Sequence, residues 1–65
     1  MNVEPNQEEV EKAMIGDEIS FMDGARGIVE KVYENSVMVK VIENHTDVEF
    51  SGNKTIVAHK NYTIS

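Results

Sequence analysis

A glycine pair inside "ISFMDGARGIVEKVY" is the first feature of the sequence that could take part in chemistry. Gly24 and Gly27 have two residues between them, which is the spacing of a loop that clamps a nucleic-acid backbone between two helices. Here strand-like apolar patterns flank the pair on both sides. We therefore favour a hairpin turn formed by Asp23, Gly24 and Gly27, in which one or both glycines have positive φ. A bare turn does not require Arg26, which makes Arg26 a candidate binding residue.

A second polar stretch places His45, Asp47 and Glu49 at alternate positions, with Glu43 just before them. On an extended segment this spacing directs alternate side chains to one side. A transition-metal site needs three or four convergent ligands, and only His45 is a strong ligand here. We therefore expect a solvated loop, with no metal site and no cofactor.

The third polar stretch is "HKNY", which precedes the end of the chain. In one interpretation Tyr62 packs its ring into the end of the fold, its hydroxyl finds a partner, and His59 or Asn61 caps a single 3₁₀ turn. In the other, His59, Lys60 and Tyr33 form an edge that binds a partner peptide or a nucleotide base. The first is better supported, because aromatic residues in so small a domain are needed first for the core. The second stays open.

Catalysis has the weakest support of any function class. No serine, histidine and aspartate constellation and no phosphate-binding loop is visible, and the chain has no cysteine. A single domain of 65 residues also has little room for a deep, water-excluding cleft. We therefore expect a binding module that is not an enzyme and has no small-molecule substrate.

Short strands are the elements that must position these residues. "EISFM" and "SVMVKVI" alternate apolar and polar residues, as half-buried antiparallel strands do. "GIVEKVY" breaks the alternation, and a bulge near Glu30 and Lys31 would bring both Val29 and Val32 to the core. A short "VEF", then "KTIVAH" and "NYTIS", complete the pattern, which predicts an all-β fold: a small antiparallel barrel of about five strands. The expected core comprises Ile19, Phe21, Val29, Val32, Val37, Val39, Val41, Phe50, Val57, Tyr62 and Ile64.

The acidity of the chain is concentrated at its start. Residues 1–18 carry six carboxylates against one lysine, whereas the rest of the chain is nearly neutral, within a net charge of -6. We expect residues 1–14 to be an acidic leader, either a frayed helix over residues 7–14 or disordered, and residues 15–65 to form the barrel. The sequence shows neither a signal peptide nor an apolar stretch of membrane-spanning length, so we expect a cytoplasmic location and no membrane partner.

The segment "GDEISFMDGARGIVEKVYENSVMVKV" resembles the SH3-like barrel of KOW-type domains. With "HKNYxI" added, residues 13–64 resemble the YkvS-like family of short, uncharacterised bacterial proteins, through the phrases "DGxxGIVEKV" and "ENSVxV". The family resemblance implies a cytosolic barrel in a bacterium and supplies no established activity, ligand or catalytic residue. The wider KOW-type resemblance implies contact with RNA, ribosomal components or the transcription machinery.

Two functional hypotheses follow. The first is a protein-interaction module that engages a protein partner through an exposed strand edge or through the face bearing Tyr33, Met38 and Lys40. The alternative is an accessory domain that binds RNA or a ribonucleoprotein, although no clustered basic patch is visible. The candidate binding residues for either hypothesis are Arg26, Lys31, Tyr33, Lys40, His59 and Lys60, with Lys54 added for the second.

Overall fold

The computed structural model describes residues 11–65, and this part of the chain is built from strands and two 3₁₀ turns. The first half of the leader helix expected over residues 7–14 lies outside the described residues, and residues 11–14 are not helical. The elements, in chain order, are β1 (Glu18–Phe21), β2 (Ala25–Val32), β3 (Ser36–Asn44), η1 (Ser51–Asn53), β4 (Lys54–Ala58), η2 (His59–Asn61) and β5 (Tyr62–Ile64).

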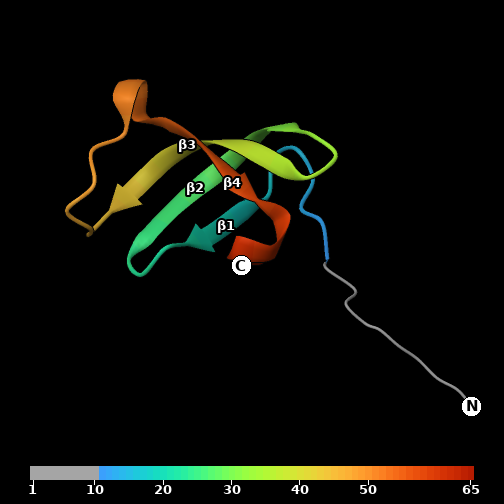
Figure 1. Cartoon of the computed structure of the whole chain (residues 1–65), viewed down its shortest axis with the longest axis horizontal. Helices are drawn as coiled ribbons and strands as arrows, with labels where there is room; N and C mark the ends of the chain where they lie inside the picture. Colours follow the sequence, from blue (N-terminus) through green and yellow to red (C-terminus); the bar gives the residue numbers. More distant parts are fainter. Residues whose placement is uncertain (1–10) are drawn as a thin grey trace, which may run out of the picture.

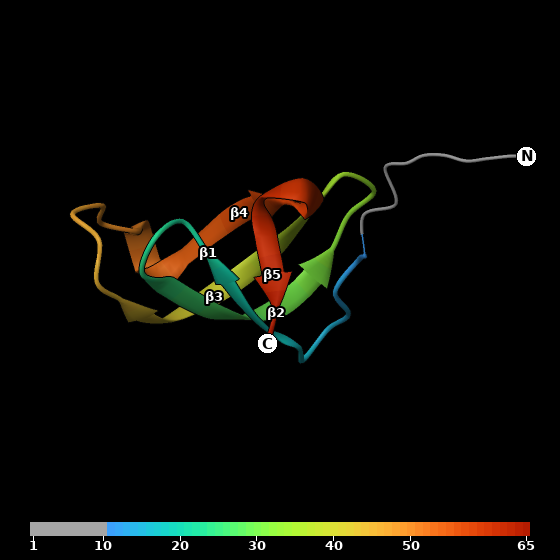
Figure 2. The ribbon, with the colours of Figure 1, turned by 90° about the horizontal axis from the view of Figure 1, so that it is seen from below.

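The strands form one antiparallel sheet in the order β4-β3-β2-β1-β5. The sheet curls, so that the end strands β4 and β5 lie on the same side of β2 and β3 (Figures 1 and 2). The result is a curled half-barrel, which confirms the all-β prediction of about five strands. The short segment 48–50 is not part of the sheet.

The bulge expected in β2 is confirmed. Val29 pairs with Val39, and the next pair is Lys31 with Met38, so Glu30 has no partner across the strand. The prediction that Val32 is buried is wrong, since its side chain is 41% exposed. Val32 lies opposite the buried Val37 and therefore on the core side, but β2 ends there and leaves Val32 at the rim of the sheet.

The core lies inside the curl of the sheet. Ile19, Val37 and Val39 are fully buried, and each apolar side chain of this size contributes about 1.5–3 kcal/mol when it leaves water. The rings of Phe21 and Phe50 meet edge to face, with their centroids 6.0 Å apart. Sequence reasoning missed the buried alanines Ala13 and Ala25. The other core or core-packed residues are Val29, Val41, Val57, Tyr62 and Ile64.

The two glycines of the first hairpin have different roles. Gly24 has φ +119° and lies in the turn between β1 and β2, where its carbonyl accepts a hydrogen bond from the backbone N–H of His45 at 2.7 Å. Gly27 lies inside β2 rather than in the turn. A Cβ atom there would come within 2.8 Å of the carbonyl oxygen of Lys40, so Gly27 permits the close approach of β3.

Candidate functional site

Four of the exposed and half-buried side chains on β2 and β3, together with the one just after β2, share the face of the sheet that points away from the core. Ile28 pairs with Lys40, and Lys31 pairs with Met38, at positions between the buried valines. Tyr33 follows directly after β2 and is 45% exposed. We name this surface the outer patch; it comprises Ile28, Lys31, Tyr33, Met38 and Lys40.

The outer patch carries two cations that have no acidic partner in the described part of the chain. Within residues 11–65, neither Lys31 nor Lys40 is within ion-pair distance of a carboxylate. The nearby lysine Lys54 differs, because its Nζ lies 3.0 Å from Oε1 of the bulge residue Glu30. Lys54 thus balances the charge of Glu30, and among residues 11–65 Lys31 and Lys40 remain as the cations of the outer patch that can attract negative charge.

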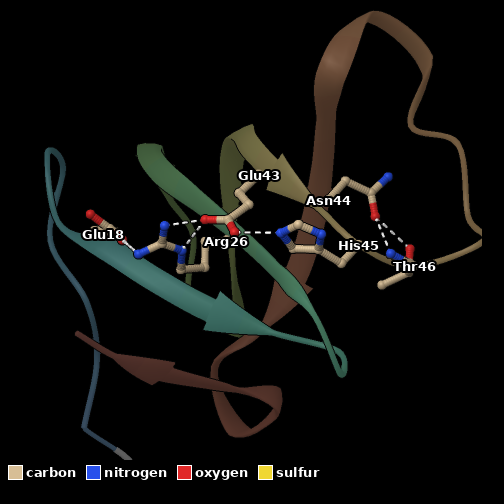
Figure 3. A network of polar contacts seen from close by, with 6 residues as sticks. All are labelled: Glu18, Arg26, Glu43, Asn44, His45 and Thr46. Atoms are coloured by element: carbon tan, nitrogen blue, oxygen red, sulfur yellow. Dashed lines mark hydrogen bonds and ion pairs between the residues drawn. The ribbon is translucent and has the colours of Figure 1, made fainter.

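Arg26 lies next to the outer patch, in β2 and not at the tip of the turn. Its Nη1 donates to Glu18 at 2.7 Å, and its Nε donates to Glu43 at 2.8 Å, with Nη2 also bonded to Glu43 (Figure 3). Glu18 belongs to β1 and Glu43 to β3, so the guanidinium bridges three neighbouring strands. We call Glu18, Arg26 and Glu43 the arginine clamp. It gives Arg26 a structural role that the sequence did not reveal.

The ion pairs shift the ionisation of both partners. Hydrogen bonding to Glu43 raises the pKa of Arg26 above its ordinary value. The same hydrogen bond, reinforced by one from His45, lowers the pKa of Glu43 (Figure 3). Three of the five Arg26 N–H groups donate to Glu18 and Glu43, so a phosphate would meet a guanidinium whose charge two carboxylates already balance.

The loop after β3 uses its polar groups internally. The Oδ1 atom of Asn44 accepts hydrogen bonds from the backbone N–H of Thr46 at 2.8 Å and from its hydroxyl at 2.6 Å (Figure 3). The Asn44 amide in turn donates to the carbonyl of Val48 at 2.7 Å. Among residues 11–65, no three His, Cys, Asp or Glu side chains are grouped so that they could hold a metal ion.

His59 is the first residue of the η2 turn. Its side chain is buried, and both ring nitrogens are hydrogen-bonded. Nε2 lies 2.8 Å from the carbonyl oxygen of Tyr33, which can only accept, so Nε2 carries the proton. Nδ1 then accepts from the hydroxyl of Tyr62 at 2.7 Å. The same hydroxyl oxygen accepts from the backbone N–H of Ala13 at 2.8 Å. This chain of bonds ties the start of the described segment, the end of β2 and the last strand together.

The predicted binding residues therefore do not form one site. Lys31, Tyr33 and Lys40 share the outer patch, and Arg26 is clamped at its border. His59 is buried, but no side chain caps the η2 turn, so the expected cap is wrong. The Tyr62 hydroxyl has partners, as the first interpretation of the "HKNY" stretch expected. Lys60 is exposed on the η2 turn.

Sequence reasoning missed Ile28 as a member of the outer patch. Ile28 directly precedes the buried Val29, and successive residues of a strand point to opposite faces. The expected burial of Val29 was therefore the available signal for the outward position of Ile28.

The described residues contain no helix that is both long enough and apolar enough to cross a membrane. No solved structure matches the chain. The uncharacterized protein YkvS of Bacillus subtilis (strain 168) is 48% identical over 54 residues, which cover 80% of this chain and 87% of that protein. A family model described as an uncharacterized protein conserved in bacteria (DUF2187) matches residues 11–65. The chain therefore belongs to this family of uncharacterized bacterial proteins, as its resemblance to YkvS-like sequences predicted.

Proposed function

We propose that this chain is a non-catalytic binding module of the bacterial cytoplasm, and that its outer patch binds an acidic segment of a partner protein. The observation that carries the proposal is the placement of Lys31 and Lys40, without acidic partners in the described part of the chain, around the half-buried Met38. The two charges select for a negatively charged partner, and the apolar groups between them favour a protein over a simple anion.

The side chains between the lysines are of the kinds that protein interfaces use. Tyrosine and methionine are enriched in such interfaces, and Tyr33 and Met38 lie on this face together with Ile28. A sheet surface also offers a fixed backbone, so little ordering of the module itself opposes binding. An acidic partner segment with one or two apolar residues would satisfy both features of the outer patch.

Binding to RNA is the alternative, and the geometry supports it less well. Affinity for nucleic acid rests on several cations that each neutralise a phosphate. Arg26 is clamped by two carboxylates and Lys54 is paired with Glu30, which leaves Lys31 and Lys40 on this face. Two cations on a chain with a net charge of -6 make a weak phosphate-binding surface.

Affinity capture from a bacterial extract tests the proposal. The tagged native chain is compared with the double variant Lys31→Glu/Lys40→Glu, in extracts with and without added nuclease. The matched control is Lys12→Glu/Lys60→Glu, which makes the same change in net charge at two exposed lysines that are not part of the outer patch.

We expect a protein that the native chain and the control both retain, that nuclease does not release, and that the outer-patch variant loses. Release by nuclease would favour the RNA alternative instead. Equal retention by both double variants would show that the outer patch is not the binding surface.

A further inference from the structure

The free edge of β4 is a second surface, which the proposed function does not use. Among residues 11–65, β4 is the last strand of the sheet and pairs only with β3. It contains no proline, and Lys54 at its start is its only charged residue. Edge strands that stay unpaired usually carry prolines, several charges or a bulge. The edge of β4 lacks these protections from Thr55 to Ala58.

The hydrogen bonds of β3 establish which backbone groups of β4 point outward. The carbonyl of Ser36 accepts from the N–H of Tyr33 at 2.7 Å, so Ser36 directs its backbone groups toward β2. Successive residues of a strand alternate in this direction, and Val37 therefore directs its groups toward Val57 in β4. Val57 thus directs its N–H and C=O groups toward β3. By the same alternation along β4, the N–H and C=O groups that point outward belong to Lys54, Ile56 and Ala58.

A second hydrogen bond gives the same assignment independently. The N–H of His59 donates to the carbonyl of Asn35 at 3.1 Å, so these two residues face each other's strand. Counting back in steps of two along β4, Val57 and Thr55 also face β3, and Ile56 between them faces outward.

Two β4 edges are complementary to each other in one antiparallel register. With a two-fold axis at Ile56, this residue lies opposite its own counterpart and Lys54 lies opposite Ala58 of the second copy. Every residue in these pairs directs its backbone groups outward, so each pair can exchange two N–H···O bonds. Shifting this register by two residues in one direction would place Lys54 opposite Lys60 of the second copy. Shifting it in the other direction would place Ala58 opposite Gly52, in the η1 turn of the second copy.

The side chains along this edge fit the same register. Ile56 is apolar yet 55% exposed, and pairing with its counterpart would cover it. A groove lined by Phe21, Met22 and Phe50 lies beside residues 55–58, so this part of β4 borders open space. Both the backbone and the exposed isoleucine are therefore accessible to a second strand.

We propose that two copies of this chain associate through their β4 edges, centred on Ile56, to form a two-fold dimer with a continuous antiparallel sheet. Such a dimer would present two outer patches on one extended surface, because β4 continues the sheet beyond β3.

Charge-swap variants at Ile56 test the dimer and its register together. Sedimentation is measured at about 0.15 M ionic strength, where the repulsion between two acidic copies is screened within about 8 Å. We expect the native chain to dimerise with increasing concentration. Ile56→Lys and Ile56→Glu should each raise the dissociation constant by about tenfold or more, since each places like charges opposite each other.

Mixing the two variants in equal amounts should restore association, because Ile56 meets only its counterpart in this register. The matched control is Ile42→Lys, which changes an isoleucine of similar exposure, 50%, in the part of β3 that β4 does not cover. The control should dimerise as the native chain does.

A backbone variant separates loss of the edge from loss of the fold. Chemical synthesis of the chain with an N-methyl group on Ile56 removes an outward N–H and keeps the side chain and the ladder to β3. We expect an unchanged circular dichroism spectrum and a monomer. The proposal is overturned by a native chain that stays monomeric up to about 1 mM, by mixed charge-swap variants that fail to associate, or by an N-methylated chain that still dimerises.

Discussion

Replacing Tyr62 by phenylalanine removes one oxygen atom that two buried groups depend on. The backbone N–H of Ala13, in a residue that is 1% exposed, loses its acceptor. Nδ1 of His59, in a residue that is 6% exposed, loses its donor. A buried polar group left without a partner costs about 1–3 kcal/mol, so the two together should cost about 2–6 kcal/mol of the free energy of unfolding.

That loss is large for so small a domain, whose total stability is expected to be about 3–10 kcal/mol. Urea unfolding followed by circular dichroism measures it, with the midpoint shifting and the slope unchanged. The matched control is Tyr33→Phe, which removes a hydroxyl from a side chain that is 45% exposed. This control should change the free energy of unfolding by no more than about 0.5 kcal/mol.

A double-mutant cycle with His59→Leu sharpens the test. If the Tyr62 hydroxyl and the His59 ring act on each other, the two substitutions together should cost less than the sum of the single costs, by about 1 kcal/mol. Tyr62→Phe with the stability of Tyr33→Phe, or exact additivity with His59→Leu, would refute the account of this hydrogen-bond chain.

Four further substitutions probe the rest of the fold. Gly27→Ala should lower the free energy of unfolding by about 1–3 kcal/mol, because its Cβ would press on the backbone of β3, and thermal unfolding measures this. The pKa of Glu43 is lower in the folded state than its unfolded-state value of about 4.5. This difference contributes stability that is present above the unfolded-state pKa and is lost as the pH falls through the folded-state pKa. Glu43→Gln should therefore flatten the acidic part of a profile of stability against pH, measured from pH 7 downward. Val37→Ala should cost about 2 kcal/mol and Val32→Ala less than half of that, in matched urea titrations, because only the first side chain is fully buried. Equal costs at the two valines would contradict the placement of Val32 at the rim.

Much of the sheet can be predicted from the sequence because its strands alternate. Val37, Val39 and Val41 point to one side, and the three-residue spacing of Val29 and Val32 reveals the bulge. The exposure of Val32 cannot be predicted in the same way. It depends on where the sheet ends, which periodicity within one strand does not specify.

The candidate site was less accessible to sequence reasoning, since its contacts join residues far apart in the chain. The partners of Arg26 lie eight and 17 residues away, and only the register of three strands brings them together. Burial of His59 likewise depends on acceptors and donors from Tyr33 and Tyr62. By contrast, Tyr33, Met38 and Lys40 could be grouped in advance, because they belong to one hairpin.

Reactivity of the lysines in the captured complex tests the central claim most directly. The complex and the free chain are acetylated under identical conditions, and mass spectrometry quantifies the modification of each lysine. The account predicts that the partner protects Lys31 and Lys40, whereas Lys12 and Lys60 react as they do in the free chain. Protection of Lys12 and Lys60, with Lys31 and Lys40 fully reactive, would contradict the assignment of the outer patch as the binding surface.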